Sequence, residues 1–232
     1  MKHSWGFLTN HALVMIYVVR HNGATVREIS VGVGVTERAT LAILRQLSDE
    51  RIIERTKEGR RTTYSVNFAR LAAYRREGTV AITPREFVDG LIKTLLAISE
   101  YHAPTNGKIP QPDSGASDPQ IGTWGFFTNH ALLLLAIVMD SQSTVRELAM
   151  SVGVTERAVV AILNQLEDAG IIVRQKQGRR NSYEVDFVAL RDFPRWSPGD
   201  WKLPPQLIDV AVQGLRALAE RTQAAPREPV PA

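Results

Sequence analysis

The sequence has no cysteine among its 232 residues. Without thiols the chain forms no disulfide and no thiolate metal site, and nothing argues for export. No apolar run approaches the ~20 residues that a membrane-spanning helix needs. The apolar stretch near the N-terminus lacks a small-residue cleavage site, so we interpret it as a helix rather than a signal peptide. A soluble protein located in the cytoplasm is therefore the expectation.

Residue clusters typical of enzymes are also missing. The sequence has no glycine-rich phosphate loop, and no nucleophile–base pair or carboxylate dyad occurs in both of its halves. His11 and His130 are single histidines without clustered carboxylates, which is a poor ligand set for a metal. We therefore expect no enzymatic activity, no metal and no other cofactor.

What the sequence does contain is a tandem duplication. Residues 4–71 align without a gap on residues 123–190, and 37 of the 68 aligned positions are identical. The repeat period of 119 residues indicates a duplicated domain, because solenoid repeats have units of ~20–50 residues. A stretch rich in Pro, Gly, Ser and Asp separates the copies, which is typical of a linker. The expected boundaries are a first domain at 1–103 (copy one), a linker at 104–120, a second domain at 121–225 (copy two) and a flexible tail at 226–232.

The local signals in copy one predict three helices. Residues 11–21 are apolar nearly throughout, which predicts a buried first helix. Thr25 and Glu28 can form a capping box that begins a second, short helix. Thr36 can cap a third helix, on which the helical spacing places Thr40, together with two leucines, inward. Copy two repeats this order of signals.

A strand, a tight turn and a second strand follow the third helix, with Gly59 at the turn of copy one. Gly170 is the expected end of the third helix in copy two, but copy one has Arg51 there. Amphipathic helices are predicted at 83–101 and 204–222 from their apolar spacing. The predicted fold class is mainly α with small β-hairpins, which is α+β.

Three helices followed by a hairpin tipped with Gly-Arg-Arg is the order of a winged helix. With the paired motifs "WGFLTNHA" and "WGFFTNHA", "VTERA" and "GRR", the sequence resembles bacterial winged helix-turn-helix transcriptional regulators of the MarR and ArsR type. The resemblance covers 4–71 and 123–190, about 60% of the chain. It implies that each third helix enters the major groove of double-stranded DNA and that each hairpin, or wing, contacts the flanking backbone or minor groove. It also implies that the helices outside the winged domains form a dimer interface, so that one chain is a monomer acting as an internal pseudo-dimer.

The residues expected to contact DNA follow from the helical spacing and from this resemblance. The outward positions of the third helices are Arg38, Leu41, Ala42 and Arg45 in copy one and Arg157, Val160, Ala161 and Asn164 in copy two. Basic residues of the wings and second helices are expected at phosphates; these are Arg27, Arg55, Lys57, Arg60 and Arg61, and Arg146, Arg174, Lys176, Arg179 and Arg180. Arg27 and Arg146 could instead pair with a local carboxylate.

The centre of each third helix is apolar, which leaves three functions open. Base edges are read mostly by hydrogen bonds, and Leu, Val or Ala can contact only thymine methyl groups. A DNA-binding regulator is the leading interpretation. Leu41 and Val160 also fit a winged-helix module that binds a protein partner, as a subunit of a chromosome-organising or regulatory complex. A sensor that holds a small molecule among the C-terminal helices is the third possibility.

The two copies differ in net charge. Residues 1–103 contain 15 Lys and Arg against 10 Asp and Glu, a net charge of +5. Residues 120–225 contain 11 of each, a net charge of zero. Because neutralisation of phosphates supplies most non-specific affinity for DNA, we expect copy one to bind DNA more strongly.

Overall fold

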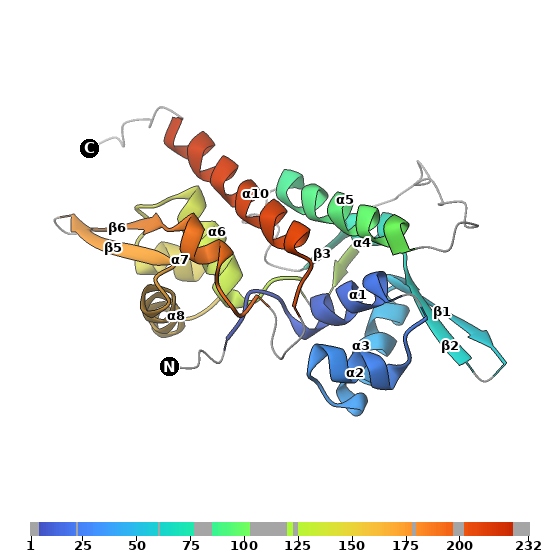
Figure 1. The fold of residues 1–232 in the computed structure, drawn as a ribbon. Coiled ribbons are helices and arrows are strands. Elements are labelled where there is room, and N and C mark those ends of the chain that lie inside the picture. The colour runs from blue at the N-terminus through green and yellow to red at the C-terminus, as the bar shows by residue number, and fades with distance from the viewer. Residues whose placement is uncertain are drawn as a thin grey trace.

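The computed structural model describes residues 5–21, 23–59, 61–76, 85–102, 120–122, 125–177, 180–196 and 202–224. These residues are mainly helical, with two antiparallel two-stranded hairpins (Figure 1). The elements of copy one are α1 (Asn10–Arg20), α2 (Val26–Val33), α3 (Glu37–Asp49), β1 (Ile53–Glu58), β2 (Arg61–Val66), α4 (Phe68–Ala73), β3 (Tyr74–Arg76) and α5 (Arg85–His102). They are followed by β4 (Gln120–Gly122), α6 (Asn129–Met139), α7 (Val145–Val152), α8 (Glu156–Asp168), β5 (Ile172–Gln177), β6 (Arg180–Val185), α9 (Phe187–Arg191) and α10 (Pro205–Ala224). No helix in the described part of the chain is long and apolar enough to cross a membrane.

The second helix of each copy begins at the predicted capping box. In copy one the Thr25 hydroxyl accepts from the Glu28 amide at 3.3 Å, and the Glu28 carboxylate accepts from the Thr25 amide at 2.7 Å. Thr144 and Glu147 make the same two bonds at 3.2 Å and 2.6 Å. Each box satisfies two amides that the first helical turn would otherwise leave without a partner.

The first helix of each copy is the centre of that copy. α1 contacts α2, α3, β2 and α5, and α6 contacts α7, α8 and α10. Seven residues of α1 and eight of α6 are buried, which explains why neither helix has a polar face. α5 and α10 also contact each other and lie along one side of the molecule (Figure 1). The two copies therefore pack together through their C-terminal helices.

The segments that precede α1 and α6 pair with each other as a short antiparallel β-bridge. The Thr9 amide donates to the carbonyl of Phe126 at 3.1 Å, and the Thr128 amide donates to the carbonyl of Phe7 at 3.0 Å. Adding the repeat period of 119 to Thr9 and Phe7 gives Thr128 and Phe126. The bonds are therefore reciprocal between the two copies.

The two threonine side chains extend this reciprocal pairing. The Thr9 hydroxyl donates to the carbonyl of Gly125 at 2.6 Å, and the Thr128 hydroxyl donates to the carbonyl of Gly6 at 2.7 Å. The Thr9 hydroxyl also accepts from the Ala12 amide at 3.3 Å, which caps α1. Thr128 makes no side-chain cap on α6. The Thr128 hydroxyl therefore bonds to the other copy without capping α6.

The copies maintain one helix contact with different side chains. A Cβ placed on Gly32 of α2 would overlap Cε2 of Tyr17 on α1. In copy two the corresponding residues are Ser151 and Ala136. The larger side chain of the pair is therefore on the first helix in copy one and on the second helix in copy two.

The ends of α3 and α8 show how one backbone geometry accommodates two residue types. Gly170, after α8, has a φ of 70°, and Arg51, at the matching position after α3, has a φ of 59°. Arg51 is the one non-glycine residue with a positive φ among the described residues. This conformation costs a residue with a Cβ about 1 kcal/mol. The turn can be predicted from Gly170, because glycine readily adopts a positive φ, but not from Arg51.

Four short elements were not predicted from the sequence. They are α4, β3, β4 and α9. β3 pairs in parallel with β4, so that Tyr74 is opposite Gln120 and Arg76 is opposite Gly122. Gln120, the first residue of β4, belongs to the stretch that the sequence predicts as a linker.

The contact between α5 and α10 should depend on Gly214. A Cβ on Gly214 would lie 2.7 Å from Cδ2 of the buried Phe87, whereas a Cβ on Gly90 would lie 3.7 Å from Cγ1 of Val210. We expect Gly214→Ala to lower the free energy of unfolding by about 1–3 kcal/mol through overpacking. Gly90→Ala in the same contact should raise it by up to about 1 kcal/mol, because alanine favours helix. Urea denaturation measures both; equal effects of the two substitutions would contradict the prediction.

Candidate functional site

α3 buries one face and exposes the other. Thr36 caps the helix by accepting from the Ala39 amide at 3.2 Å. Thr40 is buried with Leu44 and Leu47, as predicted, and its hydroxyl donates to the Thr36 carbonyl at 3.1 Å. The buried hydroxyl is thus satisfied within its own helix. The exposed face carries the predicted positions Arg38, Leu41, Ala42 and Arg45.

α8 repeats this division. Thr155 caps it by accepting from the Ala158 amide at 3.2 Å. Val159, at the position of Thr40, is buried with Leu163 and Leu166. The exposed face carries the predicted positions Arg157, Val160, Ala161 and Asn164. Both helices therefore offer a cation near the N-terminus and apolar side chains in the middle.

Large apolar side chains are exposed at matching positions of the two copies. Leu41 is 39% exposed and Val160 is 41% exposed. Val31 of α2 and Met150 of α7 are each 75% exposed and also occupy matching positions. Sequence reasoning missed this second pair, although the outward spacing of the short helices could have revealed it. Each copy thus exposes apolar surface on both its second and its third helix.

The second helices place Arg27 and Arg146 in solvent. Among the described residues, neither guanidinium makes an ion pair, so the structure does not show the local pairing considered from the sequence. The capping-box carboxylates of Glu28 and Glu147 accept from their own threonines instead. Both arginines are therefore available to an external anion.

The hairpins project from opposite ends of the molecule (Figure 1). Their strands pair in the same register, from Ile53 opposite Val66 in one and from Ile172 opposite Val185 in the other. The side chains exposed on these strands include Arg55, Lys57 and Lys176. The remaining predicted tip residues lie outside the described residues, either entirely (Arg60 and Arg179) or in their side chains (Arg61 and Arg180).

Arg174 of β5 differs from the other predicted wing residues because it is held against α8. Its Nη2 lies 3.2 Å from Oε2 of Glu167 and donates to Oδ1 of Asn164 at 3.0 Å. The Arg174 side chain is 25% exposed. Arg174 thus binds Asn164, which is also a predicted contact residue, and the carboxylate of Glu167, which the sequence did not indicate.

Copy one has a different set of residues at these three positions. Arg55 corresponds to Arg174, Arg45 to Asn164 and Ser48 to Glu167. Arg55 and Arg45 are exposed, and neither makes an ion pair within the described residues. At these three positions copy one therefore has two cations and no carboxylate, whereas copy two has one arginine paired with a carboxylate. Part of the net charge difference between the copies is thus located beside the third helices.

A histidine connects the first and third helices of each copy. His11 Nε2 lies 2.9 Å from Oε1 of Gln46, and His130 Nε2 lies 2.6 Å from Oε1 of Gln165. Trp5 of copy one stacks on His130, with ring centroids 4.4 Å apart and planes 3° apart. The described residues include no group of three His, Cys, Asp or Glu that could hold a metal. The histidines position the third helices.

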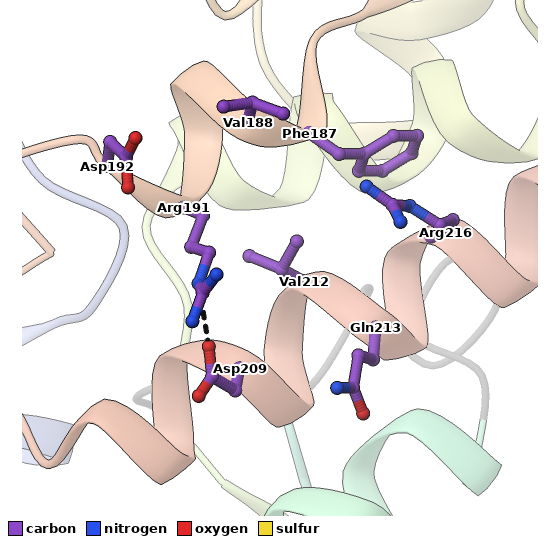
Figure 2. Close-up of a pocket in the computed structure, with 8 residues that line it drawn as sticks. All are labelled: Phe187, Val188, Arg191, Asp192, Asp209, Val212, Gln213 and Arg216. Carbon is purple, nitrogen blue, oxygen red and sulfur yellow. Dashed lines mark hydrogen bonds and ion pairs between the residues drawn. The ribbon is translucent and has the colours of Figure 1, made fainter.

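An open cleft of about 270 Å³ lies between α9 and α10 (Figure 2). Its lining residues are Phe187, Val188, Arg191, Asp192, Asp209, Val212, Gln213 and Arg216. Arg191 Nε donates to Oδ1 of Asp209 at 2.8 Å, and the Arg216 guanidinium lies over the Phe187 ring at 5.4 Å. The two cations of the cleft thus already have partners in the protein.

Stability should depend on pH through His130. Burial lowers the pKa of this imidazole below its ordinary value of 6.5, so the unfolded chain binds a proton at a higher pH than the folded chain does. The stabilisation is present above about pH 6.5 and is lost as the pH falls through the folded pKa. Urea denaturation of the wild type should therefore show a larger loss between about pH 7.5 and about pH 5.5 than His130→Gln shows. The same pH dependence in both proteins would exclude His130 as the cause.

No protein-family model matches this chain, and no curated protein or solved structure matches it.

Proposed function

We propose that the chain is a DNA-binding transcriptional regulator that binds double-stranded DNA as a single-chain pseudo-dimer of two winged helix-turn-helix domains. In this proposal α3 and α8 are the recognition helices and the two hairpins are the wings. The observation that carries it is the repeated unit itself: three helices and a hairpin occur twice, each time with an exposed third helix beside a basic hairpin.

The reciprocal pairing before α1 and α6 supports a two-fold arrangement of these units. Bonds that exchange equivalent residues are the mark of an isologous contact, in which the same patch is used by both partners. α5 and α10 lie on one side of the molecule, whereas α2, α3 and α8 lie on the other (Figure 1). Two recognition helices on one side fit a duplex whose successive major grooves are about 34 Å apart.

The side chains on this side suit both the bases and the backbone of DNA. Arg38 and Arg157, in the first turns of α3 and α8, are exposed and can each make bidentate bonds to guanine. Arg27 and Arg146 on the second helices and the cations of the hairpins can neutralise phosphates. The proposed contacts therefore combine sequence-specific and sequence-independent parts.

The proposal predicts salt-dependent binding to duplex DNA that involves the wing tips. Replacing Arg60 and Arg61 with Ala should weaken binding to every sequence, because phosphate contacts carry no sequence information. The slope of log affinity against log salt should become shallower by about 0.9 for each phosphate that the variant no longer neutralises. Fluorescence anisotropy with a labelled duplex measures both quantities. Arg221→Ala, on the exposed side of α10, is the matched control and should change neither; an unaltered slope in the wing variant would remove the wings from the interface.

A protein-interaction module is the second candidate function. The apolar side chains of Val31, Leu41, Met150 and Val160 favour it, because apolar surface that repeats on both copies suits a protein partner better than a phosphate backbone does. In this case α3 and α8 would still form the binding site, but they would contact the surface of a protein partner instead of the major groove of DNA.

Leu41→Ser together with Val160→Ser distinguishes the two functions. If these side chains contact thymine methyl groups, the variant should lose about 1 kcal/mol or less per contact, and mainly at A·T steps. If they contact a protein, the variant should keep its DNA footprint and lose its partner in co-purification. Footprinting and co-purification of the same variant decide between the outcomes, and a footprint identical to that of the wild type would favour the second function.

A further inference from the structure

We infer that Glu167 makes the two DNA-binding faces unequal by withdrawing Arg174 from the phosphate backbone, so that copy one is the high-affinity half of the pseudo-dimer. This inference rests on the proposed function and deepens it. It assigns a role in affinity and half-site preference to an acidic residue that does not itself touch DNA.

The geometry around Arg174 shows how the withdrawal occurs. Glu167 lies in the last turn of α8 and Arg174 lies on the adjacent strand β5, with 3.2 Å between the carboxylate and the guanidinium. The same guanidinium nitrogen donates to Asn164 at 3.0 Å. The Nε of Arg174 is enclosed and has no hydrogen-bond partner. The arginine is therefore folded back onto α8, and its charge is compensated before any phosphate approaches.

The corresponding region of copy one lacks this compensation. Ser48 stands at the position of Glu167, so Arg55 and Arg45 have no carboxylate there. Glu54 precedes Arg55 on β1, but adjacent side chains of a strand point to opposite faces, and the Glu54 carboxylate accepts from Asn67 at 3.2 Å. Both copies have an aspartate at the next position, Asp49 in copy one and Asp168 in copy two. This carboxylate therefore does not distinguish the two faces.

The compensation also changes what Asn164 can offer to a base. Its carbonyl oxygen already accepts from Arg174, which occupies one of the two lone pairs of this oxygen and holds it toward the arginine, whereas the amide nitrogen keeps both of its donors. Recognition of adenine by asparagine uses both the carbonyl and the amide nitrogen. Arg45, at the matching position, keeps all its donors for guanine or phosphate. The preferred DNA site should therefore have one strongly and one weakly bound half.

The inference can be tested on the full chain by giving each copy the residue that the other copy has at the position of Ser48 and Glu167. Glu167→Ser, which gives copy two the residue of copy one, should release Arg174 and let it neutralise one further phosphate. The slope of log affinity against log salt should steepen by about 0.9, which corresponds to roughly five- to tenfold tighter binding at about 0.1 M salt. The footprint should then show more equal protection of the two half-sites.

Two further variants complete the experiment. Ser48→Glu should create the ion pair with Arg55 in copy one and weaken binding by a similar factor, with a slope shallower by about 0.9. Asp168→Ser removes the same charge as Glu167→Ser at a neighbouring exposed position. Arg174 pairs with Glu167 and Asn164 rather than with Asp168, so this variant should leave the slope unchanged. Thermal melting of each variant confirms that the comparison is made on folded protein.

The outcomes separate this inference from the function on which it rests. Equal effects of Glu167→Ser and Asp168→Ser would show a general effect of charge and would overturn the inference. An unchanged salt slope for Glu167→Ser or for Ser48→Glu would also overturn the inference. If the wild type still binds DNA in that experiment, the proposed function stands. If the wild-type chain shows no salt-dependent binding to any duplex, both the inference and the proposed function are wrong.

Discussion

The reciprocal hydrogen bonds between the segments before α1 and α6 fix the arrangement on which the rest of the molecule depends. Thr9 and Thr128 each use an amide and a hydroxyl to bind the opposite copy. Because a buried central helix starts directly after each of these residues, the pairing sets the directions of α1 and α6. The third helices follow, since each is tied to its central helix by core packing and by a histidine–glutamine bond. The orientation of both exposed faces therefore depends on this short pairing together with the packing of α5 against α10.

Sequence reasoning predicted the parts of the fold that depend on local patterns. Capping residues gave the helix starts, and the spacing of apolar residues identified the buried and exposed sides of α3 and α8. It did not predict β3 and β4, because such short strands far apart in the chain carry no periodic signal. It also missed the turn at Arg51, where the chain adopts a glycine-like conformation without glycine. The clearest local signals were predictive because the duplication showed each of them twice.

The exposed positions of α3 and α8 could be predicted from the helical spacing, but the electrostatics around them could not. A count of charges gave the difference between the copies, whereas the pairing of Glu167 with Arg174 required the packing of α8 against β5. Two residues on different elements have no fixed relation in sequence, unlike neighbours three or four apart on one helix. Arg174 shows the result: its residue type suits a phosphate, but its surroundings in the fold already provide an anion. The apolar pair Val31 and Met150 was likewise revealed by exposure rather than by residue type.

The covalent connection between the copies changes how their pairing responds to dilution. In a dimer of separate subunits the paired fraction falls as the protein becomes scarce, because association depends on subunit concentration. Here both partners of every reciprocal bond belong to the same chain, so each copy meets the other at an effective concentration set by the connecting chain. The paired arrangement should thus persist when a cell contains only a few molecules, and its occupancy should not change with the level of expression.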